Sequence, residues 1–479
     1  MQKTEKEIQK YIWEHKDEFW NMVEEAHKPS FPEKNPWEYE PWELIYHQVI
    51  SEYFQSASDL KTLNLFGCEV GLPKDGESTI RTDLLGCLEG VNGFVVCELK
   101  VNRQPERQAF TELFAYSNVV RNKIAPMGRK DIVYLLISPM EERIVREATI
   151  CNLIYERNRI VAFVPEWNEA TQKLKLKLWV PEMKEFNTFT KTAFAFKNID
   201  TFKVTWRWPG KWSPINKGAK PDGLMIHQLN QVSAYAAQLM EASSINGFVY
   251  CSQLYPKWRD AGYIENGLVI CGINPYKAAK TKLLYEHGAT LKVAAETDLE
   301  ALSIFNLFPH LKNHCLEANE EVNYWYWMSE NWSSALDEIA FDVRKRLTTS
   351  YSSESMLTDH GCFTWDSFLN NSIEDIDCWN YDIHLTGLLR EFYDCQLELK
   401  YSAFQKYSTE QKSIVAENGY LKPHYIDMLN SQEHVREFLK SLTEGAADDV
   451  IDKPLDGELL WQTNHFANVF TAPEEIDFL

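Results

Sequence analysis

Residues 80–116 read IRTDLLGCLEGVNGFVVCELKVNRQPERQAFTELFAY, and this stretch decides how the first part of the chain folds. Two runs of apolar and β-branched residues, 78–88 and 93–101, predict two strands. The dipeptide Asn92-Gly93 between them is a strong hairpin signal, so we expect the strands to pair through a two-residue turn. Helical spacing over 105–121 predicts a helix directly after the second strand.

The expected hairpin brings charged side chains to one face of a sheet. Because residues alternate faces along a strand, Glu98 and Lys100 point the same way. A two-residue turn sets Asp83 opposite Asn102, and facing residues of a hairpin lie on the same side. Asp83 is therefore expected to share a face with Glu98 and Lys100 near the strand end. A loop longer by one residue would reverse this parity.

The predicted helix carries Gln108, Glu112 and Tyr116 on one face, because they lie at positions i, i+4 and i+8. The surrounding segment 99–130 is basic, with seven Lys or Arg against two acidic residues, although the whole chain has a net charge of −21. Local positive charge is what phosphate binding needs. The residues expected to contact nucleic acid are Arg103, Arg107, Arg121 and Lys123.

Two carboxylates and a lysine on one face suit the hydrolysis of phosphodiesters. The reaction needs a nucleophilic water and relief of negative charge in the transition state, and a divalent metal held by carboxylates supplies both. Mg²⁺ prefers one or two carboxylates together with waters. A nearby lysine polarises the attacking water or stabilises the phosphate. The pattern predicts a Mg²⁺ or Mn²⁺ site at Asp83 and Glu98, with Lys100 beside it.

Asp83, fourteen intervening residues and then Glu98-Leu99-Lys100 resemble the PD-(D/E)xK nuclease superfamily. Within it, the run from the hairpin into a helix is similar to RecB-type and Shedu-type nuclease domains. The resemblance covers residues 35–165 and implies that Asp83 and Glu98 bind the metal while Lys100 assists the nucleophile. Thr82 stands where the family often has Pro.

The resemblance also implies further site residues. Gln108 and Tyr116 would orient the lysine or the nucleic-acid backbone, although either Gln108 or Glu112 fits the family's helix position. Many such nucleases add an acidic residue from the preceding helix or the first strand. Glu43 is the expected third metal ligand, with Glu69 as the alternative.

The rest of the chain predicts an α/β protein with several parts. Residues 1–34 form a helical segment, and 35–168 form the nuclease-like domain with a mixed sheet. A second α/β or α+β domain spans 169–310 and begins with KLKLKLWV, expected to be an edge strand blunted by lysines. Residues 311–479 are expected to be mainly helical and to end in an acidic tail.

Several classes of protein are not supported. The ten cysteines form no CxxC pair, so a structural zinc site is not expected. The charged N-terminus is no signal peptide, and no apolar run approaches the roughly 18 residues that span a bilayer. A reduced, cytoplasmic location without a membrane partner is expected. The sequence contains no Walker-type loop, no GxGxxG after a strand, no HExxH and no GxSxG.

The expected function is therefore a metal-dependent nuclease that acts on DNA, in antiviral restriction or DNA repair. The C-terminal region would sense, recruit or restrain, and it could hold a partner protein or a second copy of the chain. Two alternatives stay open: a catalytically silent nuclease-fold scaffold that binds DNA or a protein, and a nuclease directed at RNA. Whether cutting is internal or from an end also stays open.

Overall fold

The computed structural model describes residues 3–31, 34, 38–73, 79–101, 106–206, 223–254, 266–279, 281–282, 324–350, 357–362, 376–377, 381–406 and 432–443. The chain divides into two compact units, which we call unit 1 (1–33 and 42–188) and unit 2 (34–41 and 189–479). The N-terminal segment thus belongs to the same unit as the first sheet. The division lies at residue 188, not at the expected boundary of 168.

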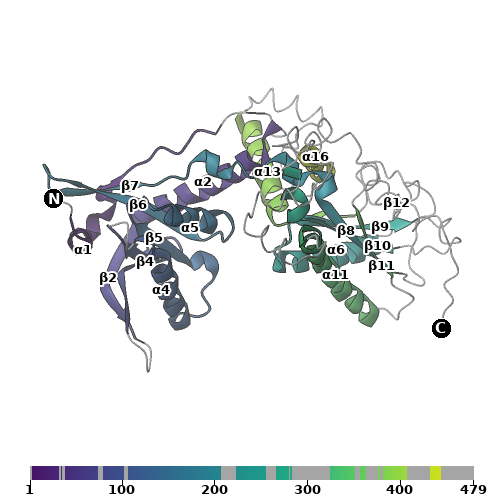
Figure 1. The fold of residues 1–479 in the computed structure, drawn as a ribbon, viewed down its shortest axis with the longest axis horizontal. Helices are drawn as coiled ribbons and strands as arrows, with labels where there is room; N and C mark the ends of the chain where they lie inside the picture. The colour runs from purple at the N-terminus through teal and green to yellow at the C-terminus, as the bar shows by residue number, and fades with distance from the viewer. Residues whose placement is uncertain are drawn as a thin grey trace, which may run out of the picture. The chain divides into compact units, whose positions relative to one another are not determined.

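Unit 1 is built on a mixed seven-stranded sheet of order β1-β7-β6-β5-β4-β3-β2 (Figure 1). β4 pairs in parallel with β5, and β5 with β6, while β2, β3 and β4 form an antiparallel meander. The α/β class with a mixed sheet is therefore confirmed. The strands are β1 (Val23–Glu24), β2 (Leu63–Leu72), β3 (Ile80–Leu88), β4 (Phe94–Leu99), β5 (Ile132–Ile137), β6 (Arg159–Asn168) and β7 (Lys173–Leu178).

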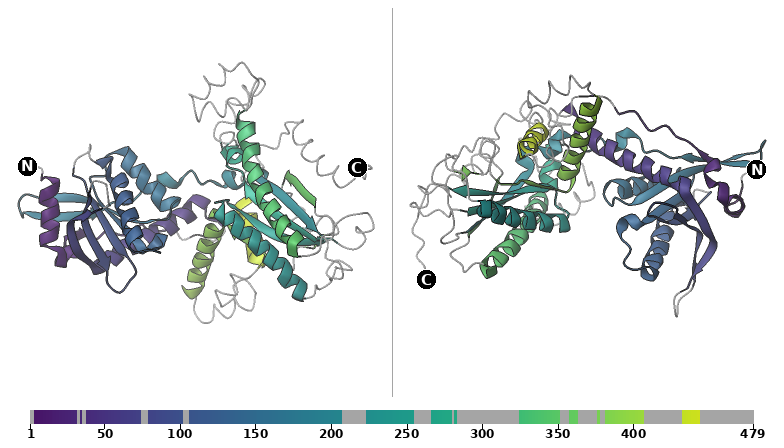
Figure 2. Two further views of the ribbon diagram at one scale, coloured as in Figure 1. Left: turned by 90° about the horizontal axis from the view of Figure 1, so that it is seen from below. Right: turned by 180° about the vertical axis from the view of Figure 1, so that it is seen from behind.

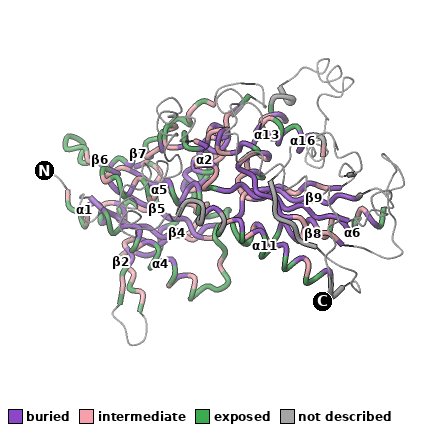
Figure 3. The backbone as a smooth tube through the Cα atoms, turned by 45° about the vertical axis from the view of Figure 1, so that its right-hand side comes forward, coloured by how far each residue is buried: buried purple, intermediate pink, exposed green. Residues whose placement is uncertain are grey.

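Burial along these strands follows their place in the sheet. All six residues of the central β5 are buried, as expected for a strand covered on both faces. β7 alternates exposed lysines with buried leucines, and β1 pairs with it over only two residues. Figure 3 shows the contrast between the buried centre of the sheet and the partly exposed β2. The expected lysine-rich strand near an edge is thus present.

The α-helices that the structure describes in unit 1 are α1 (Glu5–Glu14), α2 (Pro41–Asp59), α4 (Ala109–Lys123) and α5 (Arg143–Ile154). α4 packs against β3, β4 and β5, and α5 packs against β6 and lies beside α4 (Figure 1). The helical segment expected over 1–34 does not continue as one α-helix, because α1 ends at Glu14 and a 3-10 segment, Lys16–Met22, follows. Within that segment, the buried Phe19 meets the Phe163 ring edge to face.

Unit 2 contains a six-stranded sheet of order β11-β8-β10-β9-β12, with β13 also paired to β9. Every pair is antiparallel. Three of the strands come from the region expected to be a separate helical domain, so the predicted boundary at 310 does not divide the unit. The strands are β8 (Ile199–Trp206), β9 (Gly247–Leu254), β10 (Asn266–Ile273), β11 (Leu357–Cys362), β12 (Ile376–Asp377) and β13 (His384–Thr386).

The helices of unit 2 described by the structure are α6 (Gly223–Ala242), α11 (Tyr324–Ser350), α13 (Leu388–Lys406) and α16 (Gln432–Thr443). α6 and α11 contact each other and pack on the sheet, and Figure 2 shows them along it. Their apolar faces meet β8, β9 and β10 in one core that includes Trp206, Met240 and Leu336. The acidic tail, 444–479, lies outside the described residues. In the described part of the chain, no helix combines the length and the hydropathy that crossing a bilayer would require.

Candidate active site

The pairing of β3 with β4 places Asp83 beside Glu98. Leu84 lies opposite Cys97 in this antiparallel pair. Extending the register by one residue sets Asp83 opposite Glu98, whereas the two-residue turn predicts Asn102 there. One Asp83 oxygen, Oδ2, accepts a hydrogen bond of 2.7 Å from the N–H of the next β4 residue. The two carboxylates are thus direct neighbours across the strands.

The turn itself is longer than the sequence predicts. Cys87 faces Phe94, so six residues, 88–93, join the paired positions. Gly90 adopts φ 78, a left-handed conformation that glycine accepts without strain. The Asn92 side chain donates to the Asp131 carboxylate, a tertiary contact that replaces the expected tight turn. The loop exceeds the predicted two residues by four, an even number, so the facing parity that joins Asp83 to Glu98 is preserved.

Glu98 and Lys100 are buried side by side at the end of β4. Their side chains are 2% and 8% exposed, and Lys100 Nζ contacts Glu98 Oε1 at short range. The Lys100 N–H donates to the Ile137 carbonyl at 2.8 Å, which keeps the residue aligned with the end of β5. Among the described residues, no hydrogen-bond partner reaches Glu98 Oε2. A buried, unpaired carboxylate oxygen is costly unless another group completes it.

α4 adds a second carboxylate to the lysine. Glu112, in the first turn of the helix, brings Oε2 to 2.8 Å from Lys100 Nζ. Burial opposes ionisation of Glu112, but its interactions with Glu98 and Lys100 outweigh this and lower its pKa. Gln108 is the exposed N-cap residue of α4. Glu112, and not Gln108, therefore occupies the position beside the lysine.

Tyr116 lies one turn beyond Glu112 and is buried on the same helix. Burial raises the pKa of its hydroxyl, and the negative charges of Glu98, Glu112 and Asp83 raise it further. The hydroxyl therefore stays protonated at neutral pH and can only act as a neutral hydrogen-bonding group. The structure brings Tyr116 to the acidic cluster, as the helical spacing predicts.

α1 supplies two residues that the sequence reasoning missed. The Gln9 amide donates to the Asp83 carbonyl at 3.0 Å and approaches its Oδ1 at 3.4 Å. Glu5 Oε1 lies 4.0 Å from Lys100 Nζ, and burial raises the pKa of Glu5. The signal was available, because Glu5 and Gln9 lie four apart on one helical face and Gln9 interrupts a buried stripe formed by Ile8 and Ile12.

We use the term acidic cluster for Glu5, Asp83, Glu98 and Glu112 around Lys100. Burial is the largest cause that raises the pKa of Glu98 to about 9, and Glu112 and Asp83 add to it. Burial also raises the pKa of Asp83 to about 6, against the opposing effects of the Leu99 N–H and Lys100. Burial alone would lower the pKa of Lys100, but its hydrogen bonds to Glu112 and Glu98 give a net upward shift.

The acidic cluster suits a divalent cation. Three carboxyl groups contact Lys100, Asp83 adds a fourth negative charge nearby, and Glu98 Oε2 lacks a partner within the described residues. A metal would neutralise the excess charge and complete that oxygen. Mg²⁺ needs only one or two carboxylates, with waters and substrate phosphate completing its coordination. Asp83 and Glu98 meet this requirement, so the residues present fit the predicted metal.

The expected third metal ligand does not join them. Glu43 is buried in the first turn of α2. In the part of the chain that the structure describes, no three His, Cys, Asp or Glu side chains form a group that could hold a metal ion. Glu43 therefore does not complete a three-ligand site with Asp83 and Glu98. The alternative, Glu69, is exposed with φ 47 on β2, next to strand β3.

The predicted nucleic-acid contacts lie apart from the acidic cluster. Arg107 is exposed and forms a 2.8 Å ion pair with Glu142. Arg121 and Lys123 lie in the last turn of α4. Nine residues separate Glu112 from Arg121, which is about 14 Å along a helix axis. Arg103 lies outside the described residues.

Comparison with known proteins adds no relative. No protein-family model, no characterised protein and no solved structure matches this chain.

Proposed function

We propose that the chain is a metal-dependent nuclease of the PD-(D/E)xK type, which hydrolyses phosphodiester bonds of DNA with Mg²⁺ or Mn²⁺. The observation that carries the proposal is the acidic cluster: Asp83 and Glu98 lie side by side on neighbouring strands, and Lys100 contacts Glu98 together with Glu5 of α1 and Glu112 of α4. DNA as the substrate rests on the sequence resemblance of the segment from Asp83 to Tyr116.

Asp83 and Glu98 would hold the cation. When bound, it would supply a nucleophilic water at neutral pH and relieve charge on the phosphate. The upward pKa shift keeps Lys100 protonated at neutral pH. Lys100 would therefore act as a cation that stabilises the phosphate or orients the water, and not as a general base.

The neighbouring residues would position these groups. Glu112 holds the Lys100 ammonium, and Gln9 holds Asp83. The Tyr116 hydroxyl stays neutral beside the acidic cluster and can donate to a substrate oxygen. Arg121 and Lys123 would contact backbone phosphates farther along the nucleic acid, because their distance from the acidic cluster corresponds to a few nucleotides.

The test is a cleavage assay on the full chain with Mg²⁺, with Mn²⁺ and with a chelator. Supercoiled, linear and single-stranded DNA and a matched RNA are the substrates. We expect DNA to be cut only with metal, and the pattern of products separates internal from terminal cutting. Faster cleavage of RNA than of DNA would make RNA the substrate. Absence of any cleavage would favour a catalytically inactive scaffold with the nuclease fold.

The matched control distinguishes this activity from a contaminating nuclease. Glu98→Gln should abolish cleavage, because it removes a metal ligand while keeping the size of the side chain. Glu147→Gln makes the same chemical change at an exposed position on α5 and should cut at the wild-type rate. Equal cleavage by the wild type and Glu98→Gln would contradict the proposal.

A further inference from the structure

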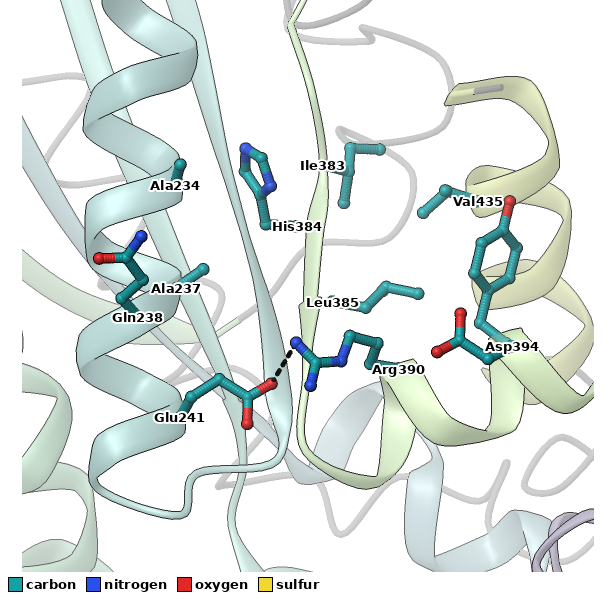
Figure 4. Close-up of a pocket in the computed structure, with 11 residues that line it drawn as sticks. Ala234, Ala237, Gln238, Glu241, Ile383, His384, Leu385, Arg390, Asp394 and Val435 are labelled. Atoms are coloured by element: carbon teal, nitrogen blue, oxygen red, sulfur yellow. Dashed lines mark ion pairs between the residues drawn. The ribbon is translucent and has the colours of Figure 1, made fainter. Parts of the chain in front are cut away.

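Unit 2 contains a pocket of about 580 Å³ between α6, β13, α13 and α16. Figure 4 shows α6 on one side, α13 and α16 on the other, and the strand that carries Ile383, His384 and Leu385 between them. A volume of this size lies within the range of small-molecule sites, roughly 300–1,000 Å³. All residues that line the pocket belong to unit 2, so the inference below does not depend on the proposed nuclease activity.

One part of the pocket wall, formed by the strand and α16, is apolar. Ile383, Leu385 and Val435 line it, and the short side chains Ala234 and Ala237 line the pocket from α6. Figure 4 shows Ile383 and Leu385 on the same side of the strand as Val435. This surface can contact the hydrocarbon part of a ligand.

Asp394 places a carboxylate beside this apolar wall. No hydrogen-bond donor or cation among the described residues pairs directly with it. Burial raises the pKa of Asp394, and the more distant Arg390 only partly offsets this. Asp394 is therefore a half-buried acceptor, at which an incoming cation with N–H donors would be favoured.

Two further polar groups of the pocket, Arg390 and His384, have partners within unit 2. Arg390 pairs with Glu241 of α6 at 3.2 Å, as Figure 4 shows. The His384 ring bonds to the Asn230 carbonyl, while its buried Nε2 has no partner among the described residues. Burial lowers the pKa of His384, so its free nitrogen is an acceptor at neutral pH. The lining thus contains two carboxylates, one cation and two acceptors that lack donors.

We infer that this pocket binds a small organic cation, whose ammonium or guanidinium group contacts Asp394 and whose apolar part packs against Ile383, Leu385 and Val435. The net negative lining and the unpartnered acceptors favour a positively charged group on the ligand. The apolar wall favours a ligand with a hydrocarbon or aromatic part. Inorganic cations would lack the second of these contacts.

The test uses 2-phenylethylamine as the probe, with 2-phenylethanol and 3-phenylpropionate as neutral and anionic analogues. Binding to the full chain is measured by calorimetry. We expect the amine to bind, the alcohol to bind about tenfold more weakly, and the acid not to bind, because a charged hydrogen bond is worth about one factor of ten or more. No binding of the amine, or equal binding of the alcohol, would overturn the inference.

Three variants of α13 locate the site. Asp394→Asn should weaken amine binding by about tenfold, for the same reason. Glu398→Gln, one turn on and exposed, removes a negative charge that acts on Asp394 from outside the pocket lining, so it should weaken amine binding by less than Asp394→Asn does. Arg390→Gln should tighten binding about twofold or more, since it removes the cation that competes for Asp394. A tightening cannot result from misfolding. Unchanged affinity in Asp394→Asn, or weakened affinity in Arg390→Gln, would refute the assignment.

Discussion

Each unit of the chain buries a lysine–carboxylate cluster, and the two clusters are balanced differently. In unit 2, Asp200 is 1% exposed, and both of its oxygens are satisfied. Lys277 reaches Oδ1, while Asn274 donates to Oδ2 at 2.7 Å and Ser333 donates to the same atom. We call this group the Asp200 network.

The acidic cluster of unit 1 has the opposite balance. One lysine contacts three carboxyl groups, with the Asp83 carboxylate as a fourth negative charge nearby, and Glu98 Oε2 has no partner within the described residues. Buried polar groups in stable proteins are satisfied, and exceptions concentrate at functional sites. The comparison indicates that a buried charge is not by itself a sign of a functional site. A buried charge that has too few partners within the protein is a stronger sign. We therefore expect the Asp200 network to contribute to stability, and we expect the acidic cluster to bind the cation of the proposed function.

The largest expected effect is on catalysis. Glu98→Gln should lower the cleavage rate by at least about 10³-fold, because the variant loses a metal ligand at the reacting centre. The free energy of unfolding of the metal-free protein should hardly change near neutral pH. The pKa of about 9 means that Glu98 is already protonated there, and the amide resembles that form. Rate measurements and denaturant titration without metal provide the two readouts.

Loss of stability in Glu98→Gln comparable to its loss of rate would break the distinction between the clusters. The same holds if the variant keeps its rate. Glu147→Gln on the exposed face of α5 again serves as the matched substitution.

The Asp200 network should respond in the other way. Asp200→Ala leaves Lys277, Asn274 and Ser333 facing a gap, and unit 2 should lose about 3 kcal/mol of unfolding free energy. Hydrogen exchange by mass spectrometry should show the loss in β8, β10 and α11, while β4 and β5 keep their protection. A stable Asp200→Ala variant would show that the network is not structural.

The third expectation concerns pH and metal. The pKa of Glu98 is raised from 4.5 to about 9, so the folded form holds a proton that the unfolded form releases. This contribution to stability is fully present below pH 4.5 and is lost as pH rises toward 9. The contribution of the Asp83 proton to stability is likewise lost as pH rises from 3.8 to about 6. The metal-free unit 1 should therefore become less stable as pH rises through these windows.

Metal should reverse this trend. Because binding displaces the Glu98 proton, the apparent affinity for Mn²⁺ should rise about tenfold per pH unit up to the pKa. At a free concentration of about 100 times Kd, the metal adds about 2.7 kcal/mol to the free energy of unfolding. Thermal unfolding at pH 6.5 and 8.5, with and without Mn²⁺, measures the effect. A shift in Glu98→Gln equal to that of the wild type would place the metal elsewhere.

Local rules predict the strands of unit 1 and the core of its site. Alternation along β4 fixes Glu98 and Lys100 on one face, and the hairpin parity adds Asp83. The register itself was off by four residues, because Asn92 is held by Asp131 and does not form the turn. Local rules carry no information about such distant contacts.

The residues and strands that the sequence did not predict also depend on distant contacts. Gln9 lies 74 residues before Asp83, and only the folded sheet brings α1 to β3. In unit 2, β11 and β13 are short strands whose sequences, LTDHGC and HLT, show no alternation. Their partners, β8 and β9, supply the pairing that their own residues do not predict.

The smallest expected effect separates the two clusters most finely. Gln9 donates to the Asp83 carbonyl and approaches its carboxylate, so Gln9→Met should cost about 1 kcal/mol of unfolding free energy. It should also lower the cleavage rate a fewfold and raise the Mn²⁺ concentration needed for half-maximal rate, because Asp83 would no longer be held beside Glu98. A purely structural role would leave the metal dependence unchanged.

Ser333→Ala is the counterpart in unit 2. It removes one of the donors to Asp200 and should cost a similar 1 kcal/mol or so. Since the oxygens of Asp200 already have donors within unit 2, the metal dependence of cleavage should stay at the wild-type value. The two substitutions would then cost the same unfolding free energy but differ in the Mn²⁺ concentration needed for half-maximal rate. That difference would assign the metal dependence to the acidic cluster. An equal metal response in both variants would show instead that it follows overall stability.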